Sequence, residues 1–153
     1  MKKIFNRIFI DGLSGMALGL FATLIIGTII CQIGTFIPGV VGTYIYAIGT
    51  FAKTITGAGI GVGVAAKLKA SPLTVVSAAV CGLIGAFPNI AIETFKIGAP
   101  GEPLGAFIAA YIATEIGGFV SGKTKVDIIV TPICCILSGA VAALFLGPYI
   151  SSA

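Results

Sequence analysis

The sequence predicts an all-α, polytopic integral membrane protein with about five transmembrane helices and a cytoplasmic N-terminus. Hydrophobic residues make up 58% of the 153 residues, and the mean hydropathy is +1.16. Charged residues make up 9% of the chain, against about 25% in an ordinary soluble domain. The apolar residues fall into runs of about 20, the length that crosses a bilayer as a helix. These observations exclude a water-soluble globular enzyme, a disordered tail and a nucleic-acid-binding module.

We expect a single transmembrane domain, 1–153, that begins with a short amphipathic segment. In residues 1–11, apolar and basic side chains occupy opposite faces of a helix, a pattern typical of helices that lie in the membrane interface. The first span covers 13–36. A cleaved signal peptide is the alternative interpretation, but Asp11 interrupts the segment and the apolar run is too long for a signal sequence.

Four further spans are predicted, over 39–66, 72–92, 104–121 and 128–150. The second contains Lys53, which divides it into halves too short to cross about 30 Å of hydrocarbon at about 1.5 Å per residue. The second span is therefore either one long tilted helix or a re-entrant pair of half-helices broken at Lys53.

The distribution of basic residues favours a second span that crosses. If the second span crosses, seven basic residues lie on the cytoplasmic side and only Lys96 lies outside. The seven are Lys2, Lys3, Arg7, Lys67, Lys69, Lys123 and Lys125. Re-entry would move the last four of these outside and leave both sides equally basic. The positive-inside rule thus predicts five crossings, with the N-terminus inside and the C-terminus outside.

Short sequence signals mark helix starts and helix contacts. Ser71-Pro72 is typical of a capped helix start, and Glu102-Pro103 places a carboxylate at the start of the fourth span. Small residues spaced four apart, as in Gly15 and Gly19, predict close helix packing. The alternating glycines of 56–67 lack the spacing of a phosphate-binding loop and favour close packing or a broken helix.

Glu115 is the strongest candidate for a functional residue. It lies in the fourth span, about 4 Å from the centre of that span at 1.5 Å per residue, and a carboxylate at such a depth usually faces a cavity or a partner. The alternative is a protonated glutamate that joins two helices by a hydrogen bond. Lys53 and Asn89 are the candidate partners, and Pro88-Asn89 also interrupts the third span, which frees backbone carbonyls.

The loop 96–105 is a second candidate. Glycines and prolines, among them Gly101, surround Glu102 next to a helix N-terminus, whose free N–H groups suit sugar hydroxyls or an anion. A plain extracellular turn fits the same residues equally well. The four cysteines lie in apolar runs, which indicates packing instead of a disulfide framework or a metal site.

Three stretches carry a family resemblance: DGLSGMALGLFATLIIGTI (11–29), GAPGEPLGAFIAAYIATEIGG (98–118) and GKTKVDIIVTP (122–132). Together they resemble the membrane-embedded EIIC component of bacterial phosphotransferase system (PTS) sugar transporters. Within that family, the chain is most similar to the perfringolysin O regulator-like subfamily. It resembles the N-terminal half of such proteins, and five spans in each half would form an inverted repeat.

The resemblance implies a homodimeric, multi-pass protein of the bacterial cytoplasmic (inner) membrane. Such a subunit binds a sugar and presents it to an EIIB partner for phosphorylation. Because the phosphoryl group comes from the partner, the chain needs no catalytic nucleophile of its own, and it would be at most the permease part of a sugar phosphotransferase.

We therefore expect a sugar-transport subunit whose substrate-binding residues are Glu115, Glu102, Asn89 and Gly101. No cofactor, metal or nucleic acid is expected. Two other classes stay open: a membrane-embedded regulator that senses a ligand without moving it, and a small homo-oligomeric cation channel with a ring of Glu115 carboxylates.

Overall fold

The computed structural model describes residues 2–86, 103–122 and 127–152, and the regular secondary structure in these ranges is entirely helical. The first helix runs without a break from Lys2 to Phe36. Its α-helical parts are α1 (Lys2–Asn6), α2 (Leu13–Leu20) and α3 (Ile26–Phe36), separated by the π-helical turns η1 (Arg7–Gly12) and η2 (Phe21–Ile25). Residues 2–11 are thus continuous with the first span, and their place in the membrane interface stays a prediction.

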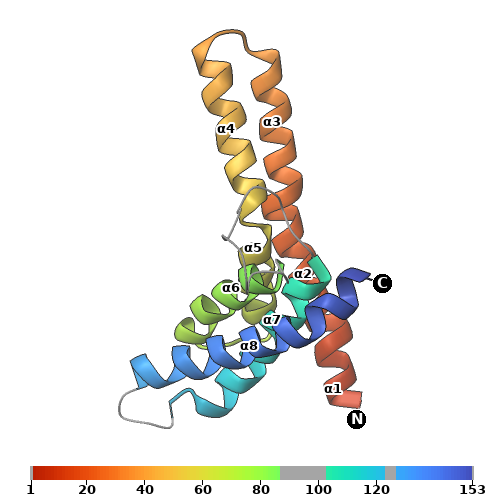
Figure 1. Ribbon diagram of the computed structural model, residues 1–153, viewed down its shortest axis with the longest axis vertical. Helices are drawn as coiled ribbons and strands as arrows, with labels where there is room; N and C mark the ends of the chain where they lie inside the picture. The colour runs from red at the N-terminus through yellow and green to blue at the C-terminus, as the bar shows by residue number, and fades with distance from the viewer. Residues whose placement is uncertain (1, 87–102, 123–126, 153) are drawn as a thin grey trace.

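A tight turn joins α3 to α4 (Val40–Thr54). Ile37 is extended, with φ −98° and ψ 119°, as expected for the residue before Pro38. Gly39 has a φ of +87°, which a glycine adopts without steric cost. The two helices form a hairpin that projects from the rest of the molecule (Figure 1). In the described residues, α3 and α4 contact only each other and the segments continuous with them.

The second predicted span is broken, as one of the two interpretations requires. Helix α5 (Thr56–Lys67) follows α4 after Ile55, and the two helices are bent by 55°. The break lies just after Lys53, where hydroxyl groups bind nearby carbonyls: Thr56 Oγ1 donates to Lys53 O at 2.6 Å. Such local bonds compete with regular helical hydrogen bonds. Whether this pair crosses or re-enters stays a prediction.

The remaining helices are α6 (Pro72–Ala86), α7 (Pro103–Val120) and α8 (Asp127–Ser152). At the base of the hairpin, α6 and α7 pack on α5, and α8 packs on α6 and α7 (Figure 1). The predicted start of α6 is confirmed, since Thr74 N donates to Ser71 Oγ at 3.4 Å. The start of α7 at Pro103 also agrees with the sequence.

Helix α5 lies between α2 and α6 at very short range. A Cβ atom added to Gly15 of α2 would lie 2.7 Å from Cα of Val64, and one added to Gly61 would lie 2.7 Å from the carbonyl carbon of Ala78 in α6. The alternating glycines thus serve close packing on two sides of one helix. Ile60 and Val64 of the same helix are fully buried and belong to the same core cluster as Phe107 of α7.

Among the described residues, two helices are long and apolar enough to cross a membrane, Lys2–Phe36 and Pro103–Val120. The bent pair α4 and α5 gives a third span if it is counted as one. Pro72–Ala86 and Ile128–Ala142 are apolar but shorter, and the predicted end of the third span, 87–92, lies outside the described residues. The number of five crossings therefore stays a prediction.

Substitution of Gly61 by alanine tests the packing of α5. The added methyl group meets the α6 backbone, which cannot move like a flexible side chain, so we expect a loss of about 1–3 kcal/mol of stability. The measurement is thermal unfolding in detergent. Gly118→Ala is the control, because nothing lies within 4 Å of an added Cβ there. Equal melting temperatures for the two variants would contradict the close contact.

Candidate functional site

Of the four predicted site residues, the structure describes Glu115. Asn89, Gly101 and Glu102 lie outside the described residues. Glu115 is on α7, about 5 Å from the centre of that helix and toward its C-terminal end at 1.5 Å per residue. The candidate site is therefore built from the surroundings of this carboxylate.

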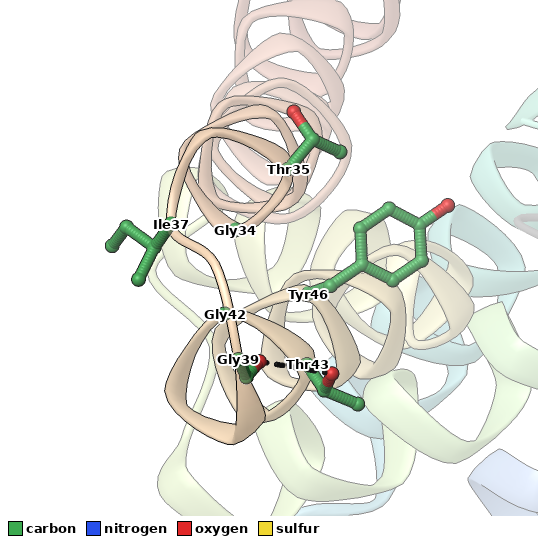
Figure 2. Close-up of a pocket in the computed structure, with 7 residues that line it drawn as sticks. All are labelled: Gly34, Thr35, Ile37, Gly39, Gly42, Thr43 and Tyr46. Atoms are coloured by element: carbon green, nitrogen blue, oxygen red, sulfur yellow. Dashed lines mark hydrogen bonds between the residues drawn. The ribbon is translucent and has the colours of Figure 1, made fainter.

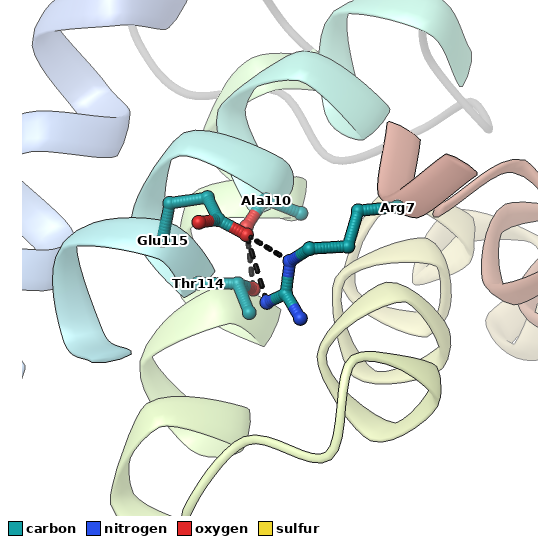
Figure 3. A network of polar contacts seen from close by, with 4 residues as sticks. All are labelled: Arg7, Ala110, Thr114 and Glu115. Carbon is teal, nitrogen blue, oxygen red and sulfur yellow. Dashed lines mark hydrogen bonds and ion pairs between the residues drawn. The ribbon is translucent and has the colours of Figure 1, made fainter. Parts of the chain in front are cut away.

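Glu115 forms an ion pair with Arg7 of the first helix (Figure 3). Arg7 contacts the carboxylate through two nitrogen atoms, a terminal one at 2.8 Å and Nε at 2.9 Å. Both contacts are made to Oε1, and the two side chains are 42% and 33% exposed. The second carboxylate oxygen, Oε2, takes no part in the contact with Arg7.

Arg7 is a partner that the sequence reasoning missed. The expected partner Lys53 lies elsewhere, with its side chain against Gly27 of α3. The sequence places Arg7 on the basic face of the predicted amphipathic segment 1–11, and the packing of η1 on α7 brings it to Glu115. No spacing in the sequence indicates that pairing.

The contact between the first helix and α7 is set by Gly12 and Phe107. A Cβ atom at Gly12 would lie 3.1 Å from the ring of Phe107, so the glycine leaves room for that ring. The ring centre of Tyr111 is 6.2 Å from that of Phe107. The Tyr111 hydroxyl interacts with both the Arg7 guanidinium and the Glu115 carboxylate. A phenol, a guanidinium and a carboxylate therefore meet at this end of the bundle.

Thr114 borders the ion pair but does not take part in it. Its hydroxyl donates to the carbonyl of Ala110 at 2.7 Å, inside α7 (Figure 3). Among the side chains that the structure describes, those of Glu115, Arg7 and Tyr111 present polar groups here.

A shallow pocket of about 370 Å³ lies at the tip of the hairpin (Figure 2). Its lining residues are Gly34, Thr35, Ile37, Gly39, Gly42, Thr43 and Tyr46. The Thr43 hydroxyl bonds to Gly39 O at 3.3 Å, and the Thr35 hydroxyl to Gln32 O at 2.6 Å, so both are committed to the backbone. The pocket and the Arg7–Glu115 pair lie near opposite ends of the first helix. No motif in the sequence indicates a pocket at these residues, although Pro38-Gly39 marks the turn.

The cysteine thiols lie within the helix packing. Cys81 donates to the carbonyl of Cys135 at 3.3 Å, and no disulfide bond joins the four cysteines. In the ranges that the structure describes, no group of three or more His, Cys, Asp or Glu side chains comes together as a metal site would require.

A double-mutant cycle tests the ion pair. Arg7→Gln and Glu115→Gln should each lower the melting temperature in detergent, and the double variant should lose less than the sum, with a coupling of about 0.5–1 kcal/mol for partly exposed side chains. The control cycle pairs Glu115→Gln with Lys53→Gln, which should be additive. Coupling in the control cycle and none with Arg7 would show that the pair is wrongly assigned.

Comparison with known proteins agrees with this picture of an apolar helical protein. The family model described as phosphotransferase system, EIIC matches residues 10–153, which is nearly the whole chain. No curated protein and no solved structure matches it. In general, this family implies a sugar substrate, an EIIB partner and a bacterial membrane as the location. The chain belongs to the phosphotransferase system EIIC family.

Proposed function

We propose that this chain binds a sugar beside Glu115, within the membrane, and presents it to an EIIB partner for phosphorylation. The observation that carries the proposal is the arrangement of the carboxylate. Arg7 balances its charge through Oε1 alone, and Oε2 can accept hydrogen bonds from sugar hydroxyls. A carboxylate inside a membrane protein is costly unless a partner or a ligand uses it.

The place of the ion pair suits transfer to a cytoplasmic partner. Glu115 lies toward the C-terminal end of α7, beside a residue near the N-terminus of the chain. In the predicted topology, that end of the bundle faces the cytoplasm. A sugar bound there would have a short path to the phosphorylated EIIB protein, which would supply the phosphoryl group.

Asn89, Gly101 and Glu102 complete the proposed site as further polar contacts for hydroxyls. We also propose the finer features implied by the resemblance: a multi-pass homodimer in the cytoplasmic (inner) membrane, similar to the perfringolysin O regulator-like subfamily. Movement of the spans around the bound sugar would then give access from alternate sides.

Sugar-dependent thermal stabilisation in detergent tests the proposal. A sugar at about 100 times its Kd should stabilise the protein by about 2.7 kcal/mol, and Glu115→Gln should remove this increment relative to the variant's own melting temperature without sugar. Asp11→Asn is the control, since it removes an exposed carboxylate that is not the one paired with Arg7, and it should keep the increment.

The other functional classes predict different results for the same purified protein. No stabilisation by any sugar in a broad panel would refute the proposal. Sugar binding without counterflow in proteoliposomes would indicate a sensing regulator. Cation currents in planar bilayers that change with Glu115→Gln would indicate a channel.

A further inference from the structure

We infer that the N-terminal segment, residues 2–11, is a latch on the candidate site that opens when the segment binds a membrane surface containing anionic lipid. The inference rests on the proposed function, because it concerns access to the Glu115 carboxylate. In the structure, the segment continues the first helix and Arg7 holds Glu115. Once bound to lipid headgroups, the segment would lie along the membrane and release that carboxylate.

The segment carries an apolar face that the described part of the protein leaves uncovered. Ile4, Phe5 and Phe9 are 62%, 61% and 51% exposed. The rings of Phe5 and Phe9 lie against each other, with their centroids 4.4 Å apart. Among the described residues, α1 contacts only the adjoining turn η1. These side chains therefore gain from an apolar partner outside the helix bundle.

Basic residues specify the chemistry of that partner. Lys2 and Lys3 are exposed, and together with Arg7 they lie on the helix face opposite the apolar one. A helix of this kind buries its apolar face at the boundary of the acyl chains and places its cations among anionic headgroups. The segment ends a candidate membrane span, so headgroups are also the surface nearest to it. Anionic lipid is thus the complementary partner.

The turn η1 can act as a joint for the segment. Helices bend at π-helical turns, which are also frequent at functional sites. At the end of η1, the Leu13 N–H points to the carbonyls of Ile10 and Ile8, whereas a regular α-helix would use the carbonyl of Phe9. The regular ladder of hydrogen bonds is therefore already interrupted where the segment would change direction.

Bending at η1 separates Arg7 from Glu115. Gly12, at one end of the turn, packs on the Phe107 ring and stays with the bundle. Arg7, at the other end, moves with the segment. A partly exposed ion pair favours the latched state only about two- to fivefold. Attraction to an anionic surface amounts to about fivefold for each basic residue, so such a surface competes successfully with Glu115.

A tryptophan on the apolar face tests the inference. The sequence contains no tryptophan, so Phe5→Trp supplies the one reporter in the full chain. The variant is placed in vesicles of phosphatidylcholine alone or mixed with phosphatidylglycerol, and quenching by lipids with brominated acyl chains is measured. We expect stronger quenching in the anionic vesicles, and loss of the difference in about 1 M salt, which screens charges beyond about 3 Å. Phe51→Trp, at an exposed site on α4, is the control and should be quenched equally in both.

Charge variants in the Phe5→Trp protein test the competition. Lys2→Gln and Lys3→Gln should each lower the ratio of lipid-bound to latched segment about fivefold in anionic vesicles. Lys67→Gln is the matched control, since it removes an exposed lysine from the end of α5 and should change nothing. Glu115→Gln should raise the lipid-bound ratio about two- to fivefold in neutral vesicles, because it removes the latch. Should Phe5→Trp fail to fold, Phe9→Trp takes its place.

Two results would overturn the inference. One is quenching that changes neither with headgroup charge nor with Glu115→Gln. The other is shielding of the tryptophan that rises with protein density in the vesicles, which would assign the apolar face to a second copy of the chain. The assay contains no sugar, so its outcome is independent of the sugar-binding test of Glu115, and failure of either is distinguishable from failure of the other.

Discussion

The close backbone contact of α5 with α2 on one side and α6 on the other determines how the helices can be arranged. Each contact requires glycine at the crossing point, as at Gly15 and Gly61. Inside a membrane, association of helices depends on such packing, because lipid is as apolar as the side chains. The position of α7 and α8 follows from this core, since both pack on α6.

The same arrangement brings the two charged residues of the candidate site together. Gly12 gives room to the Phe107 ring, and this contact sets the N-terminal part of the first helix against α7. Arg7 and Glu115 then meet although they are far apart in the sequence. The chemistry of the site therefore depends on small residues that contribute no polar group.

The sequence allowed the helical class, most helix starts and the close-packing role of the glycines to be predicted, because these depend on local composition and spacing. It also indicated Glu115 and the interruption after Lys53. The partner of Glu115 could not be predicted, since it depends on which helices pack together and at what height. The exposed hairpin was missed for the same reason: length and hydropathy predict two spans there but not that α3 and α4 leave the bundle.

The length of the first helix has a consequence for the charge pair. Its 35 residues extend about 52 Å at 1.5 Å per residue, and a hydrocarbon layer of about 30 Å could contain them only with a tilt of more than about 50°, beyond the range seen for membrane helices. One end must leave the layer, and the basic residues near Lys2 favour the N-terminal end. Arg7 then lies toward that boundary, and the hydrophobic mismatch between protein and lipid decides how far the Arg7–Glu115 pair is from the headgroups. A thicker bilayer would draw the pair into hydrocarbon and a thinner one would leave it among headgroups, so that membrane thickness sets the dielectric in which the carboxylate acts.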